Sequence, residues 1–297
     1  MTHITSKPPI LLSILIPTYN YRAGIERILE VLSPTCEDIE VIVFDDTPDS
    51  GIQSTIMGFA DTIPLLTYRH NPTHVGAALG AGANWNALLD AASGEYVLLL
   101  HHDEVPLDRG FTNMLRNRLT IRSRADVYML DLVLVNENLD PIRRHVPSWV
   151  RCWVPRRAPN YLFRRNVIGP TGTLIIRRDC APRFDPDLRW LIDVDFYRRL
   201  IDRTSKWAVA TDIRIASVQR NVGTITAHLS DHLTEIDTAE RKVLAERYPK
   251  AKLWLQASLG ARLLWIETLA WAVLKMGIWS TALLQKTRRR SFRIDYR

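Results

Sequence analysis

The sequence predicts an α/β fold in which helices flank a mostly parallel, Rossmann-like sheet, followed by a helical extension at the C-terminus. Short apolar runs alternate with segments of helical spacing, and the pattern is helical from Leu229 onward. Strands that alternate with helices form parallel sheets with right-handed crossovers. We therefore expect an α/β domain over residues 1–230 and a helical extension over 231–297.

In the first half of the chain, apolar spacing distinguishes strands from helices. Residues 10–16 form a short apolar run that ends at Pro17, and residues 23–32 repeat apolar side chains every three or four positions. Further strands are predicted over 39–44, 65–68 and 96–100, and a helix over 77–92.

The second half continues the alternation around an unusual middle segment. Helices are predicted over 110–122 and 190–201, and strands over 127–135, 172–176, 207–210 and 213–218. Residues 143–165 are rich in arginine, with three prolines, two tryptophans and no clean period. We interpret them as an irregular basic segment. Arg151, Arg156 and Arg157 form a solvated face or contact an acceptor or a diphosphate.

Composition bounds the class of protein. The 297 residues are 46% hydrophobic and 24% charged, which is typical of a globular protein with ample core. The net charge of +7 favours phosphate-bearing ligands, nucleic acid or an anionic membrane. No nucleic-acid-binding module is visible, so we expect no nucleic-acid partner. Three cysteines without metal spacing, and no secretory signal at the start, predict a cytoplasmic protein.

The expected extension has the composition of a segment that binds a membrane surface. Residues 253–284 are largely apolar and contain four tryptophans, and a basic run with Lys286, Arg288, Arg289 and Arg290 follows. Arg262, Glu267 and Lys275 interrupt the stretch and do not share one helical face. The alternatives are interfacial helices at the cytoplasmic face of a membrane, a buried helical hairpin, or a poor membrane span.

One strand end has the composition of a binding site. The run over 96–100 is followed directly by His101, His102, Asp103 and Glu104. In open α/β sheets, ligands bind beyond the carboxyl ends of the strands. A carboxylate there can hold Mg²⁺ or Mn²⁺ on a diphosphate, although a plain polar turn would have the same composition.

Five short motifs in this order resemble family 2 glycosyltransferases, which have the GT-A fold. The resemblance spans about Leu12 to Leu229, and its motifs are the segments 17–20, 45–47, 82–86, 101–104 and 190–197. It implies inversion at the anomeric carbon, a nucleoside-diphosphate sugar donor with UDP favoured, and a divalent cation, Mn²⁺ or Mg²⁺. The acceptor would be a hydroxyl group of a saccharide or lipid-linked molecule in polysaccharide or glycolipid assembly.

The resemblance also implies roles for individual residues. Asp103 matches the metal-binding aspartate, and Asp193 matches the catalytic base. The expected substrate-binding residues are Pro17, Tyr19, Asp45, Asn71, Asn86 and His102. Tyr19 would stack on the base of the donor, and Asp45 would accept a hydrogen bond from the N–H edge of that base. The alternatives are a loop aromatic for Tyr19, an ordinary turn for Asn71 and a helix-packing residue for Asn86.

Three positions depart from the pattern of the family. His102 stands where members have aspartate, Ile192 replaces the usual glutamate before the base, and Asn221 replaces a late histidine. Asp195 is the next candidate base, or it complements the N-terminus of a helix. These departures keep a non-catalytic nucleotide-sugar-binding or scaffold protein as the alternative. A Rossmann oxidoreductase is excluded, because residues 17–22 lack its glycine-rich turn.

Overall fold

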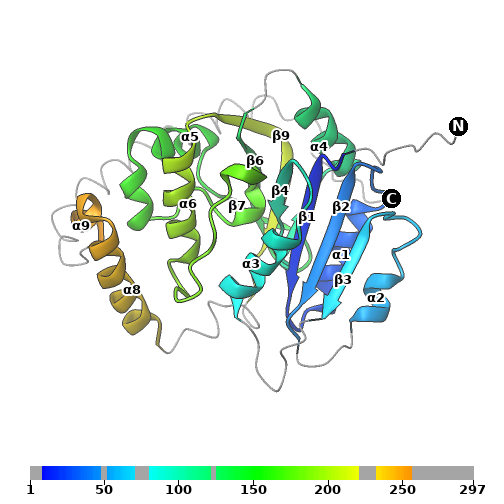
Figure 1. The fold of residues 1–297 in the computed structure, drawn as a ribbon, viewed down its shortest axis with the longest axis horizontal. Coiled ribbons are helices and arrows are strands. Elements are labelled where there is room, and N and C mark those ends of the chain that lie inside the picture. The colour runs from blue at the N-terminus through cyan, green and yellow to red at the C-terminus, as the bar shows by residue number, and fades with distance from the viewer. Residues whose placement is uncertain (1–8, 48–51, 71–79, 122–124, 221–231, 256–297) are drawn as a thin grey trace, which may run out of the picture.

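The protein, seen in a computed structural model, is built around a twisted sheet with helices on both faces (Figure 1). The structure describes residues 9–47, 52–70, 80–121, 125–220 and 232–255. Over these residues the sheet has nine strands in the order β3-β2-β1-β4-β8-β6-β9-β5, with β7 beside β6. Six strands run in one direction (β1, β2, β3, β4, β6 and β9), so the predicted mostly parallel sheet is confirmed.

The first half of the chain forms the parallel part of the sheet. Its strands are β1 (Leu12–Thr18), β2 (Ile39–Asp45), β3 (Leu66–His70) and β4 (Tyr96–Leu99). Its helices are α1 (Arg22–Leu32), α2 (Gln53–Met57) and α3 (Ala81–Ala91). The apolar face of α1 is buried as its spacing predicts, with Ile25, Ile28 and Leu29 fully covered.

Strand β1 continues through Pro17, where the sequence predicts that it ends. Its pairing with β4 stops at Leu15, so beyond that point β1 has a neighbouring strand on the β2 side alone. Proline lacks an N–H group and is tolerated where no ladder bond is required of it. Pro17 and Thr18 therefore remain in the strand, opposite Phe44 and Asp45.

The second half adds strands of both directions. Strand β8 (Leu174–Arg177) lies antiparallel between β4 and β6 (Val127–Val135). Short strands β5 (Glu104–Pro106) and β7 (Pro141–Arg144) pair with β9 and β6. The two predicted late strands are one strand, β9 (Trp207–Val218). A bulge opposite Leu130 and Asp131 shifts the register there, and pairing with β6 continues on both sides of it.

The segment over 143–165 is not irregular, as the sequence predicts, but contains a helix, α5 (Ser148–Arg157), and a 3₁₀ turn, η1 (Pro159–Phe163). Val146, Val150 and Val154 follow one another at four-residue spacing and enter the core. The period is hidden in the sequence because Arg151 is buried on the same side, with 1% of its side chain exposed. Its guanidinium donates to the carbonyls of Ile168 and Leu130.

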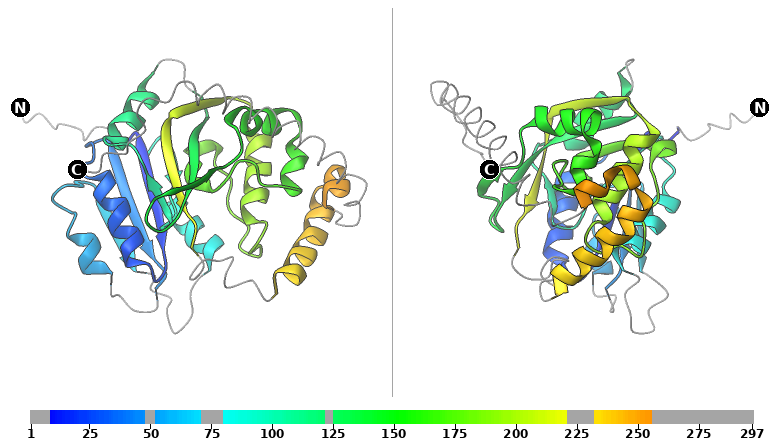
Figure 2. Two further views of the ribbon diagram at one scale, coloured as in Figure 1. Left: turned by 180° about the vertical axis from the view of Figure 1, so that it is seen from behind. Right: turned by 90° about the vertical axis from the view of Figure 1, so that its left-hand side faces the viewer.

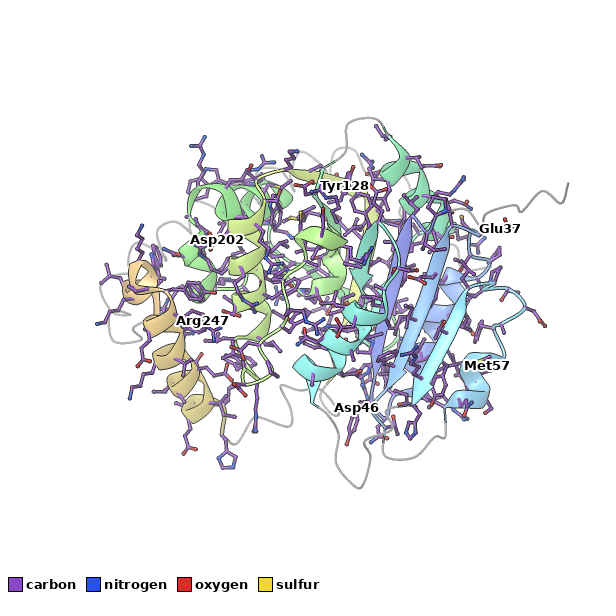
Figure 3. All side chains as sticks on the ribbon, viewed as in Figure 1. Glu37, Asp46, Met57, Tyr128, Asp202 and Arg247 are labelled. Carbon is purple, nitrogen blue, oxygen red and sulfur yellow. The ribbon has the colours of Figure 1, made fainter. Side chains whose placement is uncertain are left out.

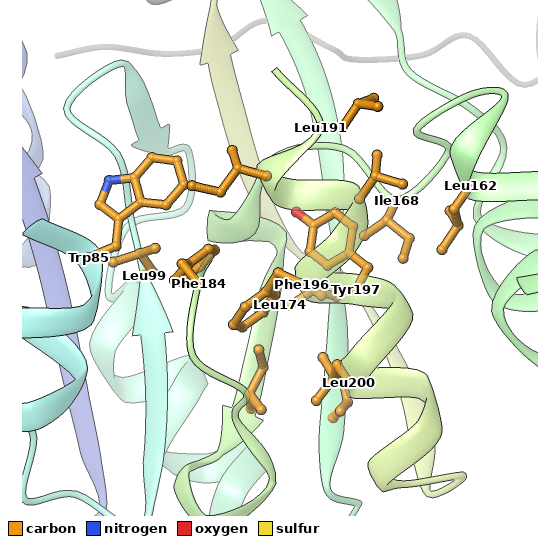
Figure 4. Packing of buried hydrophobic residues seen from close by; sticks show 14 of the residues in the cluster. Trp85, Leu99, Leu162, Ile168, Leu174, Phe184, Leu191, Phe196, Tyr197 and Leu200 are labelled. Atoms are coloured by element: carbon orange, nitrogen blue, oxygen red, sulfur yellow. The ribbon is translucent and has the colours of Figure 1, made fainter. Parts of the chain in front are cut away.

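Two hydrophobic cores cover the two faces of the sheet. Alternate residues of β1 and β2 face α1, α2 and α4 (Phe111–Thr120) on one side. The other face packs against α3, α5 and α6 (Ile192–Arg203). Figure 4 shows this second core, in which the stacked rings of Phe184 and Phe196 lie between Trp85 and Leu200. Figure 3 shows that side chains fill the space between sheet and helices.

The start of the expected extension packs on the body. Helices α8 (Leu233–Arg247) and α9 (Lys252–Leu255) lie beside α6 at the end of the molecule opposite β3 (Figures 1 and 2). Leu244 and Leu255 belong to the same core as α5 and α6. Over the described part of the chain, no helix has the length and apolar character needed to cross a membrane. The tryptophan-rich stretch after Leu255 and the basic run lie outside the described residues.

Candidate active site

The carboxyl ends of β1, β2 and β4 bring the predicted donor-site residues to one edge of the sheet. Thr18 and Asp45 are opposite one another in the register of β1 and β2. Tyr19, directly after β1, keeps 37% of its surface exposed, whereas Asp45 is fully buried. Tyr19 and Asp45 thus lie at the ends of adjacent strands, and their role in recognition of a base stays a prediction.

Asp45 also organises the edge on which it lies. One carboxylate oxygen accepts the backbone N–H of Thr47 and the other accepts the hydroxyl of Tyr68, both at 2.9 Å. The Thr47 hydroxyl accepts the N–H of Asn20 at 2.9 Å, which connects this edge to the end of β1. A carboxylate oxygen has two lone pairs, so Asp45 keeps capacity for one more donor at each oxygen.

The turn after β4 is held on several sides. The His101 ring stacks on Trp85 of α3 with ring centroids 4.6 Å apart, and its Nε2 lies 2.9 Å from the hydroxyl of Thr171. Burial lowers the pKa of His101 to about 4, so this ring is neutral at physiological pH. The Asp103 carbonyl accepts the N–H of Val218 at 2.8 Å. These contacts leave the Asp103 carboxylate partly exposed at the site.

His102 lies between the first helix and the end of β9. Its Nδ1 accepts the N–H of Tyr19 at 3.3 Å, and its ring meets the ring of Tyr21 edge to face. The Arg220 guanidinium lies 3.6 Å from the centroid of Tyr21, and its Nη1 is buried without a hydrogen-bond partner among the residues that the structure describes. Gly24 permits this packing, because a Cβ there would stand 2.2 Å from the His102 carbonyl oxygen.

Glu104 is a buried acid behind this turn. Its Oε2 accepts the N–H of His101 at 2.8 Å, while Oε1 is buried and has no hydrogen-bond partner within the described ranges of the chain. Burial and the neighbouring Asp103 carboxylate raise the pKa of Glu104 well above its usual range. A side chain at Gly172 would collide with it, since a Cβ there would lie 2.1 Å from Oε2. The sequence identifies Glu104 as part of the motif and gives no sign of this support.

Asp193 lies in the first turn of α6, close enough to Asp103 for their charges to interact. Over the described part of the chain its Oδ1 is buried without a hydrogen-bond partner, although the residue as a whole is half-buried. Burial, and then the Asp103 carboxylate, raise the pKa of Asp193 from 3.8 to about 7. A carboxylate with this pKa is suited to accept a proton near neutral pH.

Asp195, the alternative base, is a structural residue. It is fully buried, and its carboxylate accepts hydrogen bonds from Arg199, Arg247 and Tyr248. Two of these partners come from the end of α8: Arg247 donates to Asp195 at 3.0 Å, and Tyr248, the next residue, donates at 2.8 Å. The carboxylate therefore joins α6 to α8 and has no free face toward a substrate.

The other predicted residues have mixed positions. The amide of Asn86 bonds both backbone groups of Phe184, at 2.8 and 2.9 Å, which connects α3 to the segment before α6. Asn71 lies outside the described residues. Within the basic segment, Arg151 is buried against carbonyls, and Arg156 donates to the carbonyl of Trp207 at 2.6 Å. The expected contact with an acceptor or a diphosphate is therefore wrong for Arg151.

The residues around Asp103 fit a divalent cation that is shared with a ligand. Among the residues that the structure describes, no group of three His, Cys, Asp or Glu side chains gathers to form a protein-only cage. Mg²⁺ is usually bound by one or two carboxylates together with the phosphates of a substrate. The partly exposed Asp103 carboxylate provides such a ligand, next to the edge where a diphosphate would lie.

Comparison with known proteins assigns the family. Residues 13–186, more than half of the chain, match the family described as Glycosyl transferase family 2. The chain belongs to this family, which confirms the predicted resemblance. The matched residues include the strand ends with Tyr19, Asp45 and Asp103, and they end before Asp193.

Two curated relatives share part of the chain. It is 28% identical over 147 residues to abequosyltransferase RfbV of Salmonella typhimurium, covering 48% of this chain and 42% of that protein. It is 26% identical over 106 residues to a GalNAc(5)-diNAcBac-PP-undecaprenol beta-1,3-glucosyltransferase of Campylobacter jejuni, covering 35% of this chain and 33% of that protein. The chain thus spans less than half the length of either relative.

Solved structures share the fold. S. aureus TarS superimposes with a TM-score of 0.59 at 16% identity, covering 84% of this chain and 72% of that one. TarS in complex with UDP-GlcNAc gives a TM-score of 0.55 at 18% identity, covering 73% and 61%. The predicted GT-A-like architecture is therefore confirmed.

Proposed function

We propose that this protein is an inverting glycosyltransferase that moves a sugar from a nucleoside-diphosphate sugar to a hydroxyl acceptor. The observation that carries the proposal is the meeting of Asp193 and Asp103, from α6 and from the end of β4, at one edge of the sheet. Transfer to a hydroxyl needs one group that takes the proton and one that helps to neutralise the leaving diphosphate. The two carboxylates divide these roles.

Asp193 would act as the general base. With a pKa of about 7, a substantial fraction is ionised at neutral pH and can take the proton of the acceptor hydroxyl. The hydroxyl oxygen then attacks the anomeric carbon on the face opposite the diphosphate, which inverts the configuration. Asp103 would hold Mn²⁺ or Mg²⁺, and a bound cation would supply Lewis-acid stabilisation of the diphosphate.

The donor would lie along the ends of β1 and β2. The exposed Tyr19 ring can stack on a base, and Asp45 can accept its N–H edge. Pro17 lies in β1 opposite Phe44, two residues before Tyr19. His102, close to the charge of Arg220, would border the diphosphate. Asn71 and Asn86 remain predicted donor contacts. UDP-sugars are the favoured donors, and the complex of the TarS neighbour with UDP-GlcNAc supports this choice.

A panel of nucleotide sugars tests the proposal. The melting temperature is measured with UDP-, TDP- and GDP-sugars, with and without Mn²⁺, because a ligand that binds the native state raises stability by mass action. The stabilising donor is then used to measure sugar hydrolysis and transfer by wild type and Asp193→Asn. Stabilisation without turnover in the wild type would favour the non-catalytic nucleotide-sugar-binding protein.

We also propose that residues 256–297 bring the enzyme to the cytoplasmic face of an anionic membrane, where a lipid-linked acceptor would lie. Four tryptophans lie between Trp254 and Trp279, three of them in this segment, and the basic run follows. Each basic residue near an anionic surface contributes roughly 1 kcal/mol at low salt. The full chain should therefore float with anionic vesicles, and replacing Lys286, Arg288, Arg289 and Arg290 by glutamine should release it. Equal flotation of both proteins would contradict this role for the basic run.

A further inference from the structure

Helix α6 begins without a side-chain cap of its own. Its N-cap residue is Leu191, and no side chain of the preceding turn bonds to the first amide groups of the helix. Leucine is among the poorest residues at this position, because it has no acceptor for the unpaired N–H groups. The base Asp193 follows two residues later, so any movement of this turn moves the base.

Glu240 of α8, from a distant part of the chain, accepts the N–H groups of the turn that leads into α6, including the N–H of the N-cap residue Leu191. Its Oε1 accepts the N–H of Arg189 at 2.6 Å, and its Oε2 accepts the N–H of Leu191 at 2.8 Å. The N–H of Trp190 lies between them, at 3.1 and 3.2 Å from the two oxygens. Only 7% of the Glu240 surface is exposed, so these bonds are sheltered from water.

The same turn is confined on its other side by α3. A Cβ on Gly82 would stand 3.0 Å from the Ile192 side chain and 3.0 Å from the Cα of Pro186. The segment over 185–192 is thus contacted by α3 on one side and by α8 on the other. Farther along α8, Arg247 bonds Asp185 at the start of this segment and Asp195 in the first turn of α6.

From this geometry we infer that Glu240 is a positioning residue for the active site: it fixes the turn over 189–191 and thereby the place of Asp193. Because α8 begins at Leu233, it belongs to the region that the sequence assigns to a separate extension. Helix α8 is therefore part of the machinery that holds the base. The inference rests on the proposed role of Asp193, and its structural part can be tested without catalysis.

The variant Glu240→Gln tests the inference in the full-length protein. Glutamine keeps the shape of the side chain but points an NH₂ group at backbone N–H donors. We expect kcat for sugar transfer to fall at least tenfold, while the KM for the donor and the calorimetric affinity and stoichiometry for UDP stay within twofold. The matched control is Glu246→Gln, an exposed glutamate on the same helix, which should transfer sugar like the wild type.

Hydrogen exchange provides a readout that does not depend on activity. In Glu240→Gln, a peptide covering residues 187–196 should exchange faster, and a peptide from β1 should not. Should Glu240→Gln fail to fold, Glu240→Asp keeps the charge, reaches a shorter distance, and should lower kcat at least threefold with the same exchange pattern.

Each result separates the possibilities. A kcat within twofold of wild type in a folded variant would overturn the inference. A fall in UDP stoichiometry or in thermal stability that accounts for the whole loss of rate would also overturn it, since Glu240 would then be merely structural. An inactive wild type with the expected exchange pattern would overturn the proposed function and the role of Glu240 in positioning a base, leaving Glu240 as the acceptor for the turn before α6 alone.

Discussion

Replacing Asp193 by asparagine should remove turnover and, at neutral to alkaline pH, make the protein more stable. The buried Oδ1 of Asp193 has no hydrogen-bond partner among the described residues, and the pKa of Asp193 is raised from 3.8 to about 7. The folded protein therefore binds this proton more tightly than the unfolded chain does. The resulting contribution to stability is fully present below pH 3.8 and is lost as the pH rises through about 7.

The size of the effect follows from the two pKa values. A tenfold change in acidity corresponds to about 1.4 kcal/mol, so the interval from 3.8 to about 7 sets an upper limit of about 4 kcal/mol. Part of the Asp193 side chain is exposed, and solvent screening reduces this limit. Between pH 5 and pH 8 we expect the wild type to lose about 1–2 kcal/mol relative to Asp193→Asn.

Urea denaturation at several pH values, without nucleotide or metal, measures this difference. The advantage of Asp193→Asn should grow from pH 5 to pH 8, while Asp187→Asn, at an exposed position, should follow the wild type. Sugar transfer by Asp193→Asn should fall by about 10²–10⁴-fold with UDP affinity retained. A stability difference that is constant with pH would refute the burial argument, and transfer near the wild-type rate would place the base elsewhere.

Three further substitutions probe other parts of the site and its support. Asp103→Ala should abolish the Mn²⁺-dependent part of UDP binding in calorimetry, because the cation loses its carboxylate ligand; unchanged affinity would remove Asp103 from the site. Gly172→Ala should cost about 1–3 kcal/mol in urea denaturation and lower activity, since its Cβ would lie 2.1 Å from Glu104 Oε2; wild-type behaviour would show that Glu104 moves freely. Leu244→Ala should destabilise the whole body by about 2–5 kcal/mol in one cooperative transition, as its side chain is fully buried; separate melting of α8 would contradict a shared core.

Local periodicity predicted most of the sheet and its flanking helices. Strand β6 follows from a continuous apolar run, and the buried face of α1 follows from apolar residues at three- and four-residue spacing. Both patterns can be read within the segment itself. The same logic located the strand ends with Tyr19, Asp45 and Asp103, since polar residues that follow a buried run must lie at the edge of the sheet. Asp193 was predicted from a family motif near the start of a helix, and the structure places it in the first turn of α6.

Other features depend on partners that are distant in sequence. The irregular prediction for the arginine-rich segment failed because the carbonyls of Leu130 and Ile168 allow Arg151 to be buried within an otherwise apolar helix face. Asp195 could not be separated from Asp193 by spacing alone. Its role was decided by Arg247 and Tyr248, which lie about fifty positions away.

The sequence by itself determined most of the strands and helices and predicted which edge of the sheet carries the site, because alternation and polar strand ends are local properties. The tertiary structure alone decided that Glu240 bonds the turn before α6 and that α8 joins the body. A hydrogen bond between residues 189–191 and residue 240 leaves no periodic trace, since it forms only after the chain has brought the two segments together.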